Sequence, residues 1–202
     1  MNTLLIQGAC EAYVPVLKAI LESQQAYCTR HAITYMPFFG RFSHDRDPRW
    51  DRFYPMIQAL NGGRFELVVW MDADALVVDR EVDLRDATDE LTHLGMVAHP
   101  GAWRDWKFHF NCGVMYVRNT VEASRFLAEV DARGPTGETP GWENQDAIHE
   151  AIVSGSLHVD KIRNRWNSCR ANQVPHPVVQ AFHGMGPEKA LAEVSLLQTS
   201  HE

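Results

Sequence analysis

The feature that most constrains this chain is an apolar run that ends in two carboxylates. Residues 67–71 are all apolar and rich in Val, and Asp72 and Asp74 follow directly. A strand with one exposed face alternates apolar and polar residues, whereas a strand that is covered on both faces does not. We therefore predict a central strand, covered on both sides, within an α/β fold.

Asp72 and Asp74 leave this strand on one face. In extended backbone, residues i and i+2 point the same way with Cα atoms about 6.5–7 Å apart, so both carboxylates can turn toward one cation. Carboxylate oxygens suit Mg²⁺ or Mn²⁺, which complete their shells with water and phosphate oxygens. The alternative is an ordinary Asp-rich turn, but two carboxylates beside so apolar a strand repel each other. The pattern favours a divalent metal site that takes a phosphorylated ligand.

Composition argues against several classes of function. The 202 residues are 45% hydrophobic, enough for one domain with a full core, and the net charge of -7 without a basic run disfavours nucleic acid as a partner. No apolar stretch has the length of a transmembrane segment, and residues 4–6 are too short for the core of a signal peptide. The four cysteines lack a CxxC spacing, so no disulfide framework or zinc site is indicated. We expect a single domain over residues 1–202, located in the cytoplasm.

The rest of the chain alternates strand and helix patterns. Strands are predicted over residues 3–7, 32–36, 95–99, 110–117 and 157–159, and helices from near Pro15 and over 49–60, 83–91, 121–132 and a segment around 144–148. Ligands of open α/β sheets bind beyond the carboxyl ends of the strands. The loop that contains Gln7, Gly8, Ala9 and Tyr13 is therefore a candidate nucleotide contact, although a lone Gly also suits a plain turn.

Two later segments carry side chains suited to binding. Residues 100–109 are rich in aromatic side chains, including Trp103 and Trp106, and favour stacking on a sugar and packing of a long loop equally. Residues 183–189 read HGMGPEK. In that segment His183 can complete a metal shell, and Lys189 can neutralise a phosphate that the glycine backbone approaches closely.

Four motifs, in this order, resemble the landmarks of retaining glycosyltransferases of the GT-A fold. They are WMDAD at 70–74, FNCGV at 110–114, NQD at 144–146 and HGMGPEK at 183–189. The chain is similar to the glycogenin and lipopolysaccharide galactosyltransferase branch, and to the galactosyl- and xylosyltransferases that resemble yeast mannan-chain enzymes. The resemblance implies a GT-A domain, an α/β fold with a mixed, mostly parallel central sheet flanked by helices.

The resemblance also implies a function. A hexose or pentose would pass from a nucleotide-diphosphate sugar, with a UDP-sugar favoured, to the hydroxyl of a carbohydrate or a glycosylated small molecule. Mn²⁺ or Mg²⁺ would be the cofactor, and the anomeric configuration would be retained. The implied roles are metal binding by Asp72, Asp74 and His183, diphosphate binding by Gly186 and Lys189, and contact with the transferring sugar by Asn111, Gln145 and Asp146.

Two alternatives stay open. A metal-dependent phosphatase of the haloacid dehalogenase kind also places a DxD after a strand, but Ala75 and the position of Asp72 a third of the way along the chain depart from that pattern. A non-catalytic module that binds a sugar nucleotide or a glycan is compatible with the same residues, because a scaffold can keep its metal site and lose catalysis.

Overall fold

In the residues that it describes (1–103, 106–134 and 143–199), the computed structural model has a central six-stranded sheet with one reversed strand. The strand order is β2-β1-β3-β6-β5-β7. The bounds are Thr3–Ala9 (β1), Thr34–Phe39 (β2), Leu67–Asp72 (β3), Leu94–Trp103 (β5), Trp106–Arg118 (β6) and Asp160–Ile162 (β7). β6 pairs antiparallel with both of its neighbours, while the other pairs in this sheet are parallel. The predicted mixed, mostly parallel sheet is confirmed.

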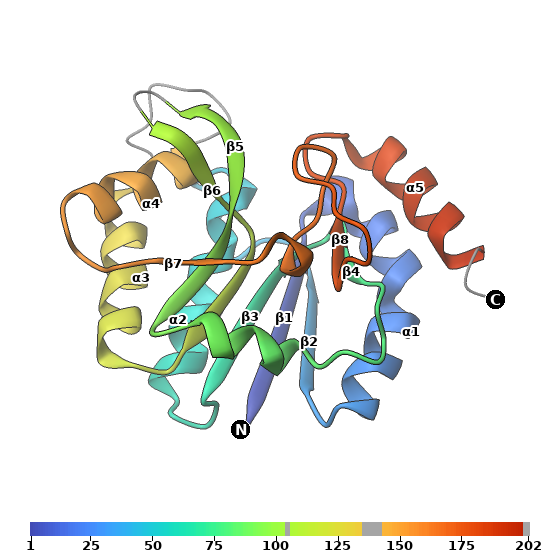
Figure 1. Ribbon diagram of the computed structural model, residues 1–202, viewed down its shortest axis with the longest axis horizontal. Coiled ribbons are helices and arrows are strands. Elements are labelled where there is room, and N and C mark those ends of the chain that lie inside the picture. The colour runs from blue at the N-terminus through green and yellow to red at the C-terminus, as the bar shows by residue number, and fades with distance from the viewer. Residues whose placement is uncertain (104–105, 135–142, 200–202) are drawn as a thin grey trace.

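Helices flank this sheet (Figure 1). The α-helices are α1 (Val14–Arg30), α2 (Phe53–Asn61), α3 (Val121–Arg133), α4 (Glu143–Val153) and α5 (Pro187–Thr199), and the 3-10 helices are η1 (Glu11–Tyr13), η2 (Pro48–Arg52), η3 (Leu84–Glu90) and η4 (Asn164–Trp166). Helix α3 packs against α2 and α4, whereas α1 packs against β2 and α5. A small antiparallel sheet of β4 (Ala75–Val77) and β8 (Val179–Ala181) lies beside α1.

The buried strands divide their side chains between two apolar clusters. On β3, Val68 and Trp70 belong to the cluster that α2, α3 and α4 complete. Val69 and Met71 belong to the cluster on the other face, which includes residues of β4, β8 and η3. All four side chains are at most 4% exposed. The unbroken apolar run thus belongs to a strand that is covered on both faces, as predicted.

β1, β5 and β6 extend beyond their predicted bounds, and two other strands begin later than predicted. The strand predicted over 157–159 lies further along the chain, as β7 from Asp160. Leu157 and Val159 are buried in the core, but pairing with β5 begins only at Asp160. The strand predicted over 32–36 begins at Thr34, since α1 continues to Arg30 and a turn with a positive φ of 51° at Ala32 follows. The helices predicted over 49–60 and 83–91 are present as η2 with α2 and as η3.

Two segments predicted as loops are partly regular. The described residues of 100–109 belong to the β5–β6 hairpin, and the side chains of 101–108 lie outside the described part, so sugar stacking there stays a prediction. Residues 183–189 end inside a helix, because α5 begins at Pro187, whose fixed φ suits a first helical turn. Residues 133–141, whose Gly, Pro and Thr content predicts a loop, also lie mostly outside the described residues.

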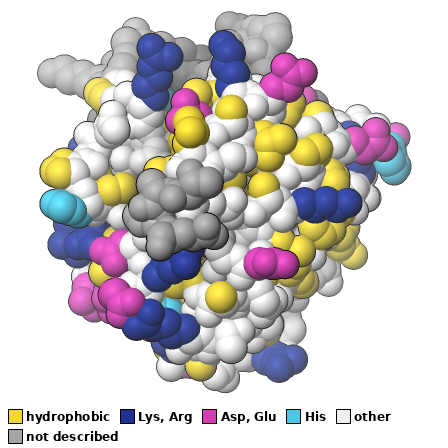
Figure 2. All heavy atoms as spheres, turned by 90° about the vertical axis from the view of Figure 1, so that its right-hand side faces the viewer, with side chains coloured by type: hydrophobic (Ala, Val, Ile, Leu, Met, Phe, Trp, Pro, Cys, Tyr) yellow, Lys and Arg dark blue, Asp and Glu magenta, His cyan; other side chains and the backbone are white. Residues whose placement is uncertain are grey.

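The face that carries α1 and α5 has a mixed surface. Figure 2 shows Lys and Arg side chains interspersed with Asp and Glu among apolar and neutral groups. α1 and α5 meet through an apolar cluster that includes Leu17, Ile20 and Val194. Among the described helices, none combines the length and the apolar character needed to cross a membrane.

Candidate functional site

The two carboxylates lie where β1 and β3 end. These strands are parallel neighbours in which Gly8 pairs with Asp72, so their carboxyl ends meet at one edge of the sheet. Asp72 is the last residue of β3, and Asp74 lies in the turn before β4. Gln7 supports this turn from the core, because its Nε2 donates hydrogen bonds to the carbonyl oxygens of Asp72 (3.0 Å) and Ala75 (2.6 Å).

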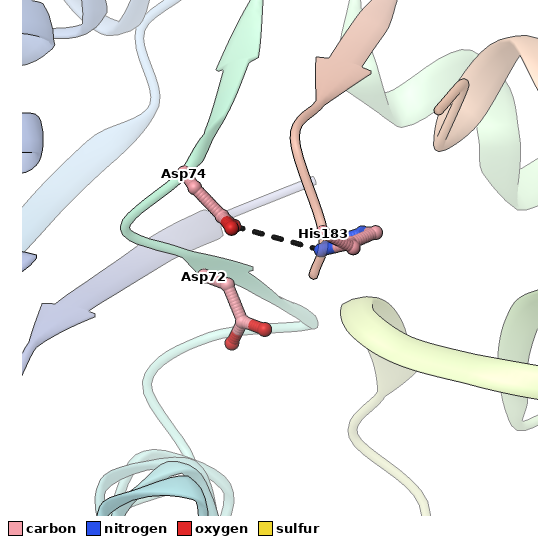
Figure 3. A group of neighbouring side chains, drawn as sticks. All are labelled: Asp72, Asp74 and His183. Carbon is pink, nitrogen blue, oxygen red and sulfur yellow. Dashed lines mark ion pairs between the residues drawn. The ribbon is translucent and has the colours of Figure 1, made fainter. Parts of the chain in front are cut away.

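Asp72, Asp74 and His183 converge at this edge (Figure 3). One ligand atom of each lies within 4.8 Å of the others, and His183 Nδ1 is 3.5 Å from Asp74 Oδ1. Asp74 is 5% exposed, and its Oδ1 accepts no hydrogen bond from the described residues. A buried carboxylate oxygen without a donor, beside an imidazole nitrogen, fits a divalent cation with oxygen and nitrogen ligands. The fold therefore brings the three predicted metal ligands together.

The charges at this edge influence one another strongly. Burial raises the pKa of the Asp72 carboxyl, and Asp74 adds to this rise, against the lowering effect of Arg52. Burial lowers the pKa of His183, but the carboxylates of Asp74 and Asp72 outweigh it and hold that pKa above its usual value. Both pKa shifts arise because negative charge is concentrated where solvent is largely excluded. A bound divalent cation would neutralise part of that charge.

These residues form one wall of a pocket of about 560 Å³, a size usual for small-molecule sites (about 300–1,000 Å³). The predicted site residues that line it are Gly8, Ala9, Tyr13, Asp72, Asp74, Asn111, Gln145 and His183. Burial, then Asp74 and Asp72, raise the pKa of the Tyr13 hydroxyl. Residues from β1, β3, β6, α4 and the segment after β8 thus meet around one cavity.

Four predicted site residues do not line this pocket. Gln7 is 0% exposed, and its Oε1 accepts a hydrogen bond from the Tyr35 hydroxyl at 2.9 Å, so both ends of its amide hold the fold. Asp146 is 1% exposed within α4. Gly186 precedes α5, and Lys189 is exposed in the first turn of that helix.

A bulge in β6 shapes the adjoining part of the pocket wall. β5 pairs Met96 with Met115, yet the next residue, Val97, pairs with Asn111, so residues 112–114 of β6 have no counterpart on β5. Bulges of this kind bend a strand, re-aim its side chains and leave backbone groups without strand partners. The bulge turns Asn111 and Gly113 into the pocket lining.

Pocket residues form hydrogen bonds with backbone groups that the bulge leaves without strand partners. The N–H of Gly113 donates to Asn111 Oδ1 at 2.8 Å, and Arg52 Nη1 donates to the carbonyl oxygen of Cys112. Arg52 is 3% exposed, and its Nη2 is 3.2 Å from Asp72 Oδ1. Sequence reasoning missed Arg52 because it lies in a helical aromatic stripe that indicates a core. Arg49 and Asp51 are charged as well, so no pattern in the sequence distinguishes Arg52 from its neighbours.

The side-chain amides of Asn111 and Asn167 connect the bulge to His183 through hydrogen bonds. Asn167 Nδ2 donates to Asn111 Oδ1 at 3.0 Å, and Asn167 Oδ1 lies 3.0 Å from His183 Nε2. Asn167 is 0% exposed. It lies in the polar segment 163–167, where the sequence has no pattern that distinguishes it from the residues around it.

A buried histidine, His99, lies near this site. His99 is 3% exposed, and its Nε2 is 3.7 Å from Cys169 Sγ. The centroid of its ring is 5.5 Å from that of His109 and 6.4 Å from that of His183. Burial, followed by the charges of His183 and His109, lowers the pKa of His99 to about 4.

We expect acid to destabilise the wild-type protein more than a His99→Gln variant. An unfolded histidine titrates near pH 6.5, so the unfolded state takes up a proton before folded His99 does, and stability falls as the pH drops from about 6.5 to about 4. The loss attributable to His99 is at most roughly 3 kcal/mol. Urea unfolding at about pH 7 and about pH 4.5 measures the free energy of unfolding. His158→Gln, at an exposed position, serves as the control, and an undiminished acid loss in His99→Gln would contradict the assignment.

Comparisons with known proteins identify the fold. No protein-family model matches the sequence, and neither does any curated protein. A glycosyltransferase involved in glycosylation of the major capsid of PBCV-1 superposes with a TM-score of 0.73 at 14% identity, over 97% of this chain and 100% of that one. The galactosyltransferase LgtC, solved with donor and acceptor sugar analogs, has a TM-score of 0.55 at 14% identity, over 98% and 95%. The glycosyltransferase GlyE of Streptococcus pneumoniae TIGR4 has a TM-score of 0.57 at 12% identity, over 100% and 63%. The expected fold of GT-A-like glycosyltransferases is therefore confirmed.

Proposed function

We propose that this protein transfers a hexose or pentose from a nucleotide-diphosphate sugar, with a UDP-sugar favoured, to the hydroxyl of a carbohydrate or glycosylated small molecule. Mn²⁺ or Mg²⁺ is the proposed cofactor, and the anomeric configuration is retained. One observation carries the proposal: the buried Asp74 and the partly buried Asp72 and His183 share their pocket with a buried amide, Gln145, whose Nε2 has no partner among the described residues. The solved structures with this fold that were compared above are glycosyltransferases.

The donor diphosphate fits the wall that contains the three ligands and Arg52. Asp72, Asp74 and His183 would hold a divalent cation, which would supply positive charge for the leaving diphosphate. The buried guanidinium of Arg52 is a second, fixed positive charge on the same wall. Tyr13, on the loop after β1, offers an aromatic ring on which the base of the nucleotide can stack.

Gly186 and Lys189 remain proposed diphosphate contacts. Gly184 and Gly186 have φ values of 75° and 76°, a region that glycine enters without steric cost, and they form the turn between His183 and α5. Lys189 follows on the same segment with its side chain in solvent. Movement of this turn over the donor brings the amine toward the diphosphate and excludes water, which favours transfer over hydrolysis.

Gln145 is the proposed contact of the transferring sugar. It is 7% exposed, and its backbone N–H donates to Asn144 Oδ1 at 2.9 Å, which fixes the start of α4. A buried amide nitrogen without an acceptor is costly unless a ligand supplies one, and a sugar hydroxyl does so. Gln145 lines the pocket and Asp146 does not, so we assign the sugar contact to Gln145 and leave Asp146 as support of the helix.

The same geometry supports retention. The bond between the anomeric carbon and the diphosphate oxygen breaks, the acceptor oxygen bonds to that carbon on the same face, and the acceptor's proton passes to a phosphate oxygen. Inversion needs a carboxylate base on the opposite side of the sugar, whereas Gln145 is an amide. Among the described residues, the other two acids that line the pocket are engaged: Asp51 Oδ2 is 2.6 Å from Arg41 Nε, and Asp47 Oδ1 is 2.7 Å from Arg49 Nε.

An array of nucleotide sugars and glycoside acceptors tests this function. We expect mass spectrometry to detect a glycosylated acceptor in the presence of Mn²⁺ and none in EDTA. Proton NMR of early product from an α-linked donor is expected to show an α-linkage. A β-linked product would refute retention. Metal-dependent donor binding in calorimetry without transfer to any acceptor would instead favour a non-catalytic binding module.

A further inference from the structure

We infer that Asn167 is a positioning residue that fixes the tautomer of His183, so that His183 binds the cation through Nδ1 and keeps its proton on Nε2. The inference rests on the proposed metal site. Asn167 does not line the pocket, and of the three proposed metal ligands its side chain contacts His183 alone. Its other side-chain hydrogen bond is to Asn111.

The first step fixes the orientation of the Asn111 amide. The backbone N–H of Gly113 is always a donor, and it lies 2.8 Å from the side chain of Asn111. The Asn111 atom at that position must accept, so it is Oδ1. The amide of Asn111 cannot be flipped without leaving a buried N–H facing an NH₂ group.

The second step carries this orientation to His183. The atom of Asn167 that lies 3.0 Å from Asn111 Oδ1 must donate, so it is Nδ2, and Oδ1 of Asn167 points the other way. That Oδ1 lies 3.0 Å from His183 Nε2 and can only accept. His183 Nε2 therefore carries a proton, and in the neutral ring Nδ1 has a free electron pair directed toward Asp74 Oδ1, 3.5 Å away.

The surroundings hold Asn167 in place. It is 0% exposed, and its backbone carbonyl accepts a hydrogen bond from Asn172 Nδ2 at 3.1 Å. A ligating histidine is oriented by the partner of its other nitrogen, and loss of such a partner usually weakens metal binding about tenfold to a hundredfold. The hydrogen bonds from Gly113 through Asn111 and Asn167 to His183 form a chain, which we call the amide relay. Asn111, for which a sugar contact was expected, is the residue whose orientation the backbone fixes in this relay.

The first test uses the wild-type protein alone. With isotope-labelled protein and Cd²⁺ as the NMR-active probe, we expect scalar coupling between the metal and Nδ1 of His183, while Nε2 keeps its proton. His183→Gln identifies the signals of this ring. Coupling to Nε2 would overturn the inference.

The second test removes the relay. We expect Asn167→Ala to weaken the binding of Mn²⁺ alone about tenfold to a hundredfold, measured by electron paramagnetic resonance. Asn172→Ala is the matched control, because it removes a buried amide from the same turn and leaves the Asn167 side chain with its partners. Circular dichroism monitors folding of both variants.

The outcomes separate this inference from the function. Unchanged Mn²⁺ affinity in folded Asn167→Ala, or an equal loss in Asn172→Ala, would overturn the role of Asn167 and leave the metal site standing. Wild-type protein that binds no Mn²⁺ would overturn the metal site and this inference together, and the transfer assay would then decide the function separately.

Discussion

The Asp74→Asn variant is expected to fold and to lose both Mn²⁺-dependent donor binding and sugar transfer. Asn keeps the size of the side chain but removes the charge of a 5% exposed carboxylate whose Oδ1 accepts no hydrogen bond from the described residues. Charge stabilisation by a bound cation amounts to several kcal/mol, which corresponds to a loss in rate of at least about a hundredfold. Calorimetry with UDP- and GDP-sugars, with Mn²⁺ and in EDTA, measures the binding.

Thermal unfolding separates this loss from misfolding. Mn²⁺ should raise the midpoint of unfolding of the wild-type protein, because a ligand that binds only the folded state stabilises it, and should leave Asp74→Asn unchanged. Asp86→Asn changes an exposed carboxylate in η3 and should behave as the wild type does. Donor affinity that is equal in Mn²⁺ and in EDTA for the wild type would contradict the metal site.

A Gly113→Ala variant is expected to lose most of its Mn²⁺ affinity. An added Cβ at this position would lie 2.2 Å from Cε1 and 2.8 Å from Nε2 of His183, and 2.9 Å from Asn111 Oδ1. The imidazole ring must move, which displaces the nitrogen that faces Asp74. We expect Mn²⁺ binding and transfer to fall by at least about tenfold, with a destabilisation of about 1–3 kcal/mol from overpacking.

Gly95→Ala is the matched control for crowding. Its added Cβ would lie 2.8 Å from Ile162 Cγ2 and from Leu91 Cδ1, in the same sheet but among residues that do not line the pocket. We expect a similar loss of stability in urea and unchanged Mn²⁺ affinity. Equal Mn²⁺ affinity in the two variants would show that the position of the His183 ring does not depend on Gly113.

Local patterns predicted the parts of the fold that local physics determines. The run at 67–71 predicted a strand buried on both faces, because its alternate residues, such as Val68 and Val69, all had to be apolar to enter two opposite clusters. The spacing of Asp72 and Asp74 predicted a shared face. His183 lies more than a hundred residues further on, and the motif around it, rather than any periodicity, associated it with the carboxylates.

The residues that escaped prediction act through tertiary contacts. Arg52 and Asn167 are both buried, and each meets its partners only when β6 bulges beside β3. Gln7 was expected at the ligand because it ends the predicted strand over residues 3–7, where ligands of such sheets bind. Its side chain instead turns into the core, since the carbonyl oxygens of Asp72 and Ala75 need donors there. No one-dimensional pattern distinguishes these two outcomes for a polar residue at a strand end.

The bulge in β6 divides the β5–β6 hairpin into an inner and an outer part. On one side of the bulge, β6 pairs with residues Leu67 to Met71 of β3. On the other side, from Ala98 and Phe110 outward, the described residues of β5 and β6 pair only with each other. Residues 112–114 of β6, which have no partner on β5, separate the pairing register of the inner part from that of the outer part. The outer part of the hairpin could therefore change in length and sequence while the inner part of β6 stays paired with β3, the strand that ends at Asp72, one of the proposed metal ligands.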